Sequence, residues 1–137
     1  MVENLKKLIK NSYSPISHYG VACILVCKNG QEFLGANTET PSGKAGMCAE
    51  QSAISAAITE GYTSKDFKEL HVMGTGKEIC TPCFLCRQLL VEFFDASCDV
   101  ICYNKKGNSK TYKVEELCPH AFKLEESDGK WIRKIIK

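Results

Sequence analysis

Short apolar runs separated by polar turns divide the first part of the chain into a helix and a pair of strands. Apolar residues recur at helical spacing in residues 2–9, with lysines between them, which predicts a short amphipathic helix. Residues 21–27 form a continuous apolar run, which is typical of a strand buried on both faces. The Asn29-Gly30 dipeptide favours a hairpin turn, so residues 32–36 are expected to return as a second strand.

The middle of the chain predicts a loop, a helix and a strand, in that order. Residues 37–46 contain a proline and two glycines and are expected to form a loop. Residues 48–59 are rich in alanine and other good helix formers, and Gly61 follows where a C-terminal cap belongs. Residues 70–73 are a short strand candidate that ends at a glycine.

A further helix is expected over residues 82–94. Pro82 is suited to the first helical position, where its missing N–H group costs nothing. The helical period places Leu85, Leu89 and Phe93 on one stripe, which is predicted to face the core.

Two more strands are expected at residues 99–103 and 109–114, on either side of a Lys-Lys-Gly-Asn turn. The order is therefore helix, two strands, helix, strand, helix, two strands. This order predicts an α/β fold with a mixed β-sheet of about five strands flanked by helices.

Chain length, charge and cysteine content predict the number of domains and the cellular location. Residues 1–137 have the length of a single domain, which ends in a basic tail at about residues 123–137. A net charge of +2 indicates no nucleic-acid partner, and no apolar run is long enough for a membrane span. The nine cysteines are an odd number in a chain without a signal-peptide pattern, which favours a reducing, cytoplasmic location.

Three of these cysteines fall in a pattern that suits a catalytic zinc ion. Cys48 and Cys83 lie at or near predicted helix starts, where the helix dipole favours the thiolate, and Cys86 follows one turn later. Three protein ligands leave the fourth tetrahedral position open for water. Glu50, two residues after the first ligand, can reach that water without binding the metal and is the candidate proton carrier.

An alternative interpretation is that the same cysteines form a structural zinc site. Cys80 completes a run with Cys83 and Cys86, and together with Cys48 it would make a closed four-thiolate zinc. Glu50 would then be an ordinary exposed helix residue. The remaining cysteines and the three histidines show no ligand spacing and are expected to be structural; they are Cys23, Cys27, Cys98, Cys102, Cys118, His18, His71 and His120.

Most of the chain resembles the cytidine deaminases of the short, homotetrameric, three-cysteine type. The matching segments are Tyr13-Ser14-Pro15, Ser17-His18-Tyr19, Gly35-Ala36-Asn37-Thr38-Glu39, Cys48-Ala49-Glu50-Gln51-Ser52-Ala53-Ile54, Pro82-Cys83-Phe84-Leu85-Cys86-Arg87-Gln88 and Glu116-Leu117-Cys118-Pro119-His120-Ala121-Phe122. The zinc motifs would fit the whole deaminase superfamily, whereas the Asn-x-Glu element points to a free nucleoside.

The resemblance implies a zinc enzyme that converts cytidine and 2′-deoxycytidine to uridine and 2′-deoxyuridine. It implies one Zn²⁺ per subunit, attack of a zinc-bound hydroxide on C4, and proton transfer by Glu50. It also implies a homotetramer with active sites shared between subunits, and a role in pyrimidine salvage. The residues that it implies for substrate binding are Asn37 and Glu39 at the sugar hydroxyls, together with Tyr19, Ala49 and Phe122, the last of them acting in a neighbouring subunit's site.

The chain departs from the family pattern at three places. Gln51 stands where three-cysteine members commonly carry arginine, so the negative charge of three thiolates needs another counterbalance, for which helix N-termini and Arg87 are candidates. Phe84 replaces a glycine and is expected to tighten or shift the second ligand loop. Residues 41–43 lack an aromatic that often forms part of the pocket wall.

Three other functions fit parts of the pattern. The first is a deaminase for another aminopyrimidine, against which Glu39 argues. The second is a deaminase for single-stranded nucleic acid, but the sequence lacks a basic groove with interleaved aromatics. The third is a zinc-stabilised binding protein without catalysis, which only Cys80 supports.

Overall fold

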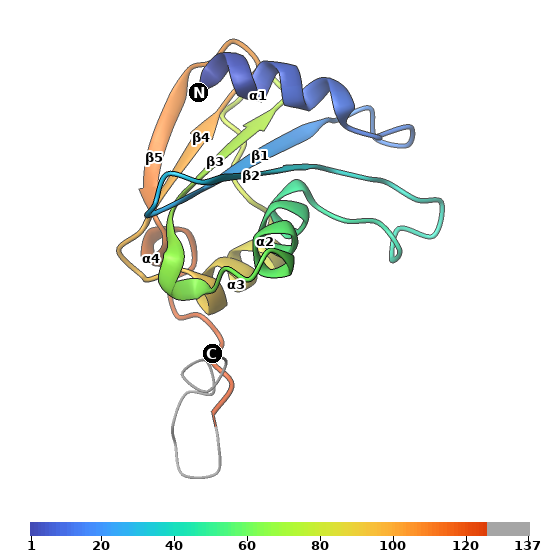
Figure 1. Ribbon diagram of the computed structural model, residues 1–137. Coiled ribbons are helices and arrows are strands. Elements are labelled where there is room, and N and C mark those ends of the chain that lie inside the picture. Colours follow the sequence, from blue (N-terminus) through green and yellow to red (C-terminus); the bar gives the residue numbers. More distant parts are fainter. Residues whose placement is uncertain (126–137) are drawn as a thin grey trace.

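A five-stranded sheet lies between one helix on one face and three helices on the other (Figure 1). The computed structural model describes residues 1–125, so most of the basic tail predicted at 123–137 lies outside the described residues. In chain order the elements are α1 (Val2–Leu8), η1 (Ile9–Asn11), β1 (Val21–Cys27), β2 (Glu32–Ala36), α2 (Ala49–Thr59), η2 (Ser64–Asp66), β3 (Phe67–Gly74), α3 (Phe84–Phe93), β4 (Asp99–Tyr103), β5 (Ser109–Lys113) and α4 (Val114–Leu117).

The strand order is β2-β1-β3-β4-β5, and only the β3–β4 pair is parallel. A parallel pair needs a crossover connection, and α3 lies in the segment between β3 and β4 that supplies it. The sheet confirms the mixed α/β fold. The predicted bounds of β1, β2 and β4 are also confirmed.

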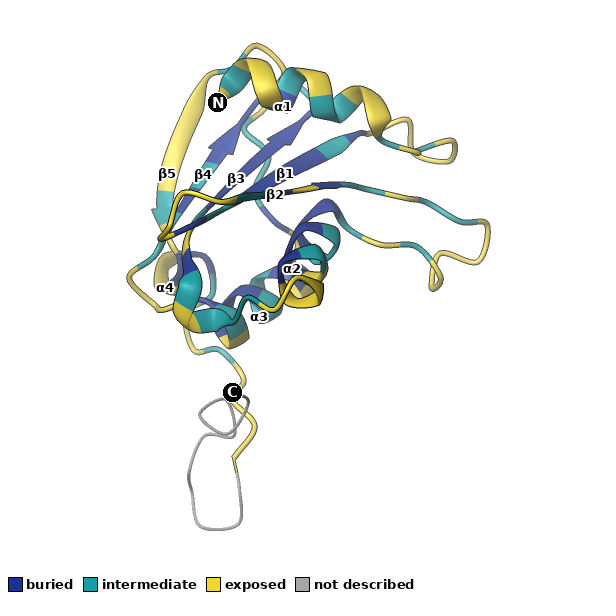
Figure 2. Ribbon diagram, viewed as in Figure 1, coloured by how far each residue is buried: buried dark blue, intermediate teal, exposed yellow. Residues whose placement is uncertain are grey.

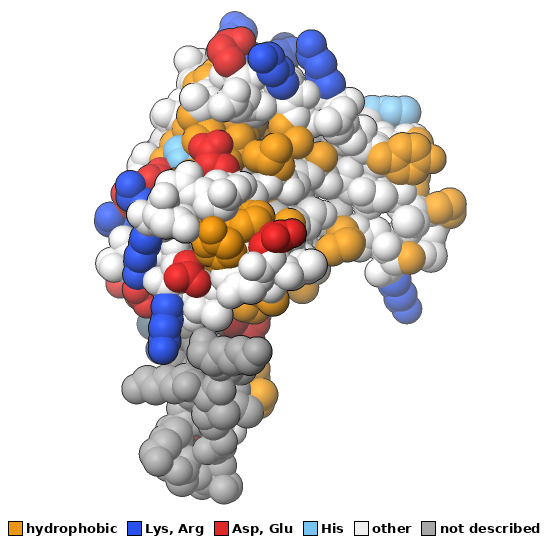
Figure 3. All heavy atoms as spheres, viewed as in Figure 1, with side chains coloured by type: hydrophobic (Ala, Val, Ile, Leu, Met, Phe, Trp, Pro, Cys, Tyr) orange, Lys and Arg blue, Asp and Glu red, His pale blue; other side chains and the backbone are white. Residues whose placement is uncertain are grey.

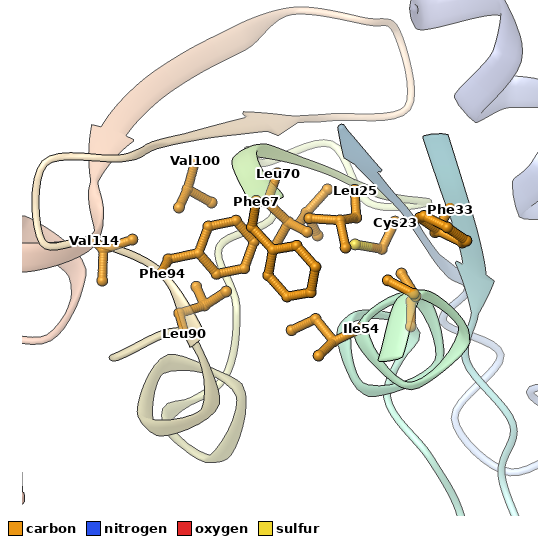
Figure 4. Packing of buried hydrophobic residues seen from close by; sticks show 14 of the residues in the cluster. Cys23, Leu25, Phe33, Ile54, Phe67, Leu70, Leu90, Phe94, Val100 and Val114 are labelled. Carbon is orange, nitrogen blue, oxygen red and sulfur yellow. The ribbon is translucent and has the colours of Figure 1, made fainter. Parts of the chain in front are cut away.

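β1 is buried on both faces, as its apolar run predicts. Cys23 and Leu25 point into the main core between the sheet and helices α2 and α3 (Figure 4). Ala22 and Ile24 belong to a smaller cluster with Leu5 of α1 on the opposite face. The burial colours follow the same division, because the central strands are buried while β5 is largely exposed (Figure 2).

α2 lies unusually close to β2, and a glycine makes this approach possible. A Cβ atom added at Gly35 would lie 2.2 Å from the carbonyl oxygen of Ala49 and 2.7 Å from the backbone nitrogen of Ala53. Only glycine fits there. The first turn of α2, with the end that carries Cys48, is thereby held against the sheet edge.

The predicted inward stripe of α3 is wrong for Leu85, which is 62% exposed, whereas Leu89 and Phe93 are partly buried and pack against the core. The buried residues of the helix are Cys86, Leu90 and Val91. The helix is turned so that the Cys86 thiol faces inward, and Leu90, four residues later, follows it onto the same face. Pro82 also precedes the helix rather than beginning it, because Cys83 is the N-cap residue.

Other differences concern element ends. β3 begins earlier than predicted, at Phe67, whose ring packs against Phe94 at 5.3 Å between centroids. β5 stops at Lys113 because Val114 opens the short helix α4, which the sequence pattern did not predict. Within residues 1–125 no helix has the length and apolar character needed to cross a membrane.

Candidate metal centre and active site

Three thiols converge where α2 and α3 begin. Cys48 is the N-cap residue of α2, Cys83 is the N-cap residue of α3, and Cys86 lies in the first turn of α3. Their sulfur atoms all lie within 4.8 Å of one another. Two helices on the same face of the sheet therefore contribute to one cluster.

This donor set fits a zinc ion. Tetrahedral Zn–S bonds of about 2.3 Å place sulfurs roughly 3.8 Å apart, which the cluster reaches with a small inward shift. Cys86 is fully buried and Cys83 is exposed, so one side of the cluster is open to a further ligand. In the described part of the chain this is the only such group of three potential ligands, and Cys80 does not belong to it. The geometry thus favours three protein ligands over a closed four-thiolate site.

The pKa of the Cys48 thiol is lowered to about 7, first by its hydrogen bond with Cys86 and further by one with Cys83. The same contact and burial raise the pKa of Cys86. Cys48 is also held by its backbone, whose N–H group donates to Oε1 of Gln51 at 2.9 Å. This bond is half of a capping box at the start of α2. Gln51 thus fixes the first ligand, a role that the sequence did not suggest.

Glu50 is buried beside the thiol cluster. It is only 4% exposed, and burial raises the pKa of its carboxyl above the ordinary value. The residue follows Cys48 into the first turn of α2 but is not part of the thiol group. A carboxyl with a raised pKa holds and releases a proton more readily near neutral pH than an exposed one.

A pocket of about 630 Å³ opens in front of this site. It brings together most of the residues predicted from the sequence: Tyr19, Asn37, Glu39, Cys48, Ala49, Glu50 and Cys83. Cys86 lies behind the pocket in the core, and Phe122 is not among the lining residues. Residues of the 40–46 loop close the wall where the expected aromatic is missing.

Asn37 and Glu39 are held by the loop that follows α1. The Asn37 amide oxygen accepts the Val21 N–H group at 2.9 Å, and its NH₂ group donates to the Tyr19 carbonyl at 3.1 Å. One Glu39 oxygen accepts the N–H groups of Ile16 and Ser17, each at 3.0 Å. The hydrogen bonds with Ser17 lower the pKa of the Glu39 carboxyl. Both side chains are therefore oriented before any ligand arrives.

Arg87 ties the second ligand loop to α4. Its Nε donates to the Pro82 carbonyl at 2.7 Å and its Nη2 donates to Oγ1 of Thr81 at 3.0 Å. Its Nη1 donates to the Leu117 carbonyl at 2.8 Å. The guanidinium lies 4.5 Å from the centre of the Phe84 ring, which is 73% exposed. Phe84 therefore points outward and stacks on Arg87, and the thiols of the loop still converge.

Phe122 lies away from this pocket. Its backbone carbonyl accepts the side-chain amide of Gln88 at 2.9 Å, and its ring is 66% exposed. Exposed hydrophobic side chains also gather where the loops before β1 and after β2 project (Figure 3); they include Tyr13, Ile16 and Met47. Within one chain, Phe122 is therefore not part of the pocket.

The structural cysteines behave largely as expected. Cys23, Cys27 and Cys102 are buried, while Cys98 and Cys118 are half-buried at the edge of the core. The described histidines take no part in the thiol cluster either. In the described part of the chain, none of these residues belongs to a group of three potential metal ligands.

Comparison with known proteins gives a consistent result. The sequence model described as "Cytidine and deoxycytidylate deaminase zinc-binding region" matches residues 1–103. A cytidine deaminase of Mycoplasma genitalium is 32% identical over 123 residues, which cover 90% of this chain and 93% of that protein. A cytidine deaminase of Sporosarcina psychrophila is 32% identical over 126 residues, covering 92% and 91% of the two chains.

A solved structure has the same fold. The crystal structure of cytidine deaminase from Burkholderia pseudomallei superposes with a TM-score of 0.84 at 30% sequence identity, covering 88% of this chain and 95% of that one. The fold, the three thiols and these matches define a zinc-dependent deaminase. Within that class, the chain belongs to the cytidine and deoxycytidylate deaminase family, and zinc is its cofactor.

Proposed function

We propose that the protein hydrolyses cytidine and 2′-deoxycytidine to uridine and 2′-deoxyuridine, with release of ammonia. The observation that carries the proposal is the buried Glu50 carboxyl beside the thiol cluster, in the pocket that also contains Asn37 and Glu39. The relatives named above are cytidine deaminases, which supports the pyrimidine nucleoside as the substrate class. Nucleic acid and membranes are not among the proposed partners.

Cys48, Cys83 and Cys86 would hold the zinc ion. When bound, the zinc would supply Lewis acidity that lowers the pKa of a nearby water molecule. Glu50 would take a proton from the attacking water and deliver it to N3 of the pyrimidine, while the water oxygen bonds to C4. Glu50 would then carry the second proton of the water to the amine, the bond from C4 to that nitrogen would break, and ammonia would leave. Atoms balance as one water and one cytidine giving one uridine and one ammonia.

Asn37 and Glu39 would bind the sugar hydroxyls, chiefly the 3′-OH. A carboxylate offers roughly four acceptor sites, and the Glu39 carboxylate accepts hydrogen bonds from Ile16 N–H, Ser17 N–H and the Ser17 hydroxyl, which leaves one for a ligand. The Asn37 NH₂ group has two donors, of which one is used by the Tyr19 carbonyl. Because a ligand without the hydroxyl leaves these groups unpaired, free cytosine would be rejected.

The active form is proposed to be a cytoplasmic homotetramer that acts in pyrimidine salvage. Phe122 would reach a neighbouring subunit's pocket, and its exposed ring is available for such a contact. Ala49 and Tyr19 would contact the nucleoside from the subunit's own side, since both line the pocket.

Ultraviolet absorbance of the purified protein with cytidine, 2′-deoxycytidine and cytosine tests the proposal. We expect the absorbance of both nucleosides to change, the change to stop when a zinc chelator is added, and cytosine to remain unchanged. No change with any of the three, in protein that contains one zinc per chain, would instead point to another aminopyrimidine or to a structural zinc. Rapid turnover of cytosine would contradict the roles of Asn37 and Glu39.

A further inference from the structure

Tyr19 and Cys80 meet over one glycine at the side of the pocket. A Cβ atom added at Gly74 would lie 2.3 Å from the Tyr19 hydroxyl oxygen and 2.8 Å from Cβ of Cys80. The Tyr19 ring also packs against Gly76, where an added Cβ atom would lie 3.1 Å from the ring carbon Cε2. Tyr19 and Cys80 both line the pocket in which Glu50 lies. The two side chains therefore form one continuous piece of the wall.

The Tyr19 backbone is fixed by hydrogen bonds. Its N–H group donates to the Ser17 hydroxyl at 3.0 Å, and its carbonyl accepts the Asn37 amide at 3.1 Å. The next residue, Gly20, donates to Oγ1 of Thr75 at 3.0 Å and accepts the Thr75 N–H group at 3.0 Å. The backbone that carries the ring is thus joined to the end of β3.

The hydroxyl end of the ring lies next to the Cys80 side chain, because both border the same point above Gly74. Burial raises the pKa of Tyr19, and hydrogen bonding with Cys80 raises it further. Cys80 is itself positioned by its N–H group, which donates to the Tyr103 carbonyl of β4 at 3.2 Å. Phenylalanine would fill the same ring position but could not make this bond. The sulfur is therefore a specific partner for a tyrosine at this place.

We propose that Cys80 is a positioning residue for substrate binding, which accepts the Tyr19 hydroxyl and holds the ring as a preformed wall of the nucleoside pocket. A wall that is already ordered does not lose side-chain freedom when the ligand enters, so affinity rises without a change in the chemical step. This inference rests on the proposed function. It also explains the presence of a fourth cysteine near the zinc ligands without making it a ligand.

A double-mutant cycle between the two residues tests this role. Cys80→Ala and Tyr19→Phe each remove the hydrogen bond, so each variant is expected to raise KM for cytidine about threefold to tenfold and to change kcat by less than about twofold. The Kd for the product uridine, measured by calorimetry, should rise by the same factor as KM. In the Tyr19→Phe background, Cys80→Ala should have almost no further effect.

Cys80→Ser is the matched control, because the serine hydroxyl can still accept the tyrosine hydrogen bond. This variant should keep KM within about twofold of the wild type. All variants should retain one zinc per chain in metal analysis. If Cys80→Ala does not fold, Cys80→Ser and Tyr19→Phe still test the bond from its two ends.

Three results would overturn the inference. Equal effects of Cys80→Ala in the wild type and in the Tyr19→Phe background would mean that the sulfur acts independently of the hydroxyl. An unchanged KM would mean that the bond does not position the ring, and loss of zinc would make Cys80 a ligand. Wild-type protein that does not convert cytidine would overturn the proposed function instead, so the two failures are distinguishable.

Discussion

Glu50 and His71 show how differently burial acts on two titratable side chains of this protein. Glu50 lies in the pocket beside the thiols, where a raised pKa would serve the proposed proton transfer. His71 lies in the sheet, where its ring nitrogens contact the Tyr103 hydroxyl and a Glu69 oxygen, each at 2.8 Å. Burial therefore affects the proposed chemistry at Glu50, whereas at His71 it affects the stability of the fold.

Replacing Glu50 with glutamine should abolish turnover without loss of the metal. The variant keeps the shape of the side chain but cannot carry a proton, so kcat for cytidine should fall by at least about 10²–10⁴-fold. Metal analysis should still find one zinc per chain, because Glu50 is not part of the thiol cluster. Glu60→Gln, at the exposed end of the same helix, is the control and should retain full activity. Substantial remaining turnover in Glu50→Gln would refute the assigned role.

His71 should make stability depend on pH. Desolvation lowers the pKa of the ring in the folded protein, although Glu69 opposes this effect. Because the unfolded chain binds the proton more readily, the free energy of unfolding should fall as the pH decreases below about 6.5. The free energy of unfolding can be measured by urea titration of zinc-loaded protein between pH 5 and pH 8, and it should depend less on pH in His71→Gln than in the wild type. His120→Asn is the control, because His120 is exposed and its replacement should change this pH dependence little. An unchanged pH dependence in His71→Gln would contradict this explanation.

The starts of helices α2 and α3 position the metal ligands. Each start has a cysteine as its N-cap residue, and each is fixed by a different side chain: Gln51 caps α2, and Arg87 holds the loop before α3. Gln51, the residue after Glu50, therefore has a hydrogen-bonding role at the start of α2. Charge compensation for the thiolates would come from the helix N-termini and from Arg87.

Gln51→Arg tests whether Gln51 acts as a helix cap while the helix N-termini and Arg87 compensate the thiolate charge. Arginine cannot accept the Cys48 N–H group, so the free energy of unfolding should fall by about 0.5–2 kcal/mol in urea titrations. kcat should change less than about threefold, because the site does not need another positive charge. Gln51→Ala, which also removes the cap but adds no charge, is the matched control. A large rate increase in Gln51→Arg alone would show that the thiolate charge was not compensated.

The elements could be predicted largely from the sequence, because their hydrophobic periods are regular. The ligands and Glu50 could also be recognised, since their spacing along the chain is characteristic. The orientation of α3 could not, because the inward position of Cys86 follows from meeting Cys48 of another helix. The hydrogen bonds of Arg87 were missed because two of its three acceptors are backbone carbonyls, and one of these, Leu117, lies 30 residues away. The role proposed for Cys80 was missed because its partner, Tyr19, is distant in the sequence.

The described part of the molecule leaves large hydrophobic side chains exposed on α3 and on the segment after α4. Phe122, Phe84 and Leu85 are all more than half exposed, and all three come from α3 or the segment after α4. Such side chains are commonly covered in an assembly. This arrangement supports the proposal that subunits meet on this surface, which reaches the pocket at Leu85.

Phe122→Ala tests the shared active site. Sedimentation of the wild type should give a tetramer, and the variant should lose at least about tenfold in kcat/KM or dissociate to smaller species, because an aromatic side chain at an interface contributes strongly. The zinc content should not change. Leu124→Ala, a nearby exposed residue, serves as the control. A monomeric wild type with full activity would contradict the proposal.

The hydrogen bonds of Arg87 set a lower limit on the length of a functional unit. The family match ends at residue 103, but the guanidinium that supports the second ligand loop also requires the carbonyl of Leu117. A fragment cut at the end of the match would keep every zinc ligand and Glu50, yet it would leave Arg87 without the acceptor that Leu117 provides. Fusions, circular permutations and minimal versions of this enzyme should therefore be designed to retain α4.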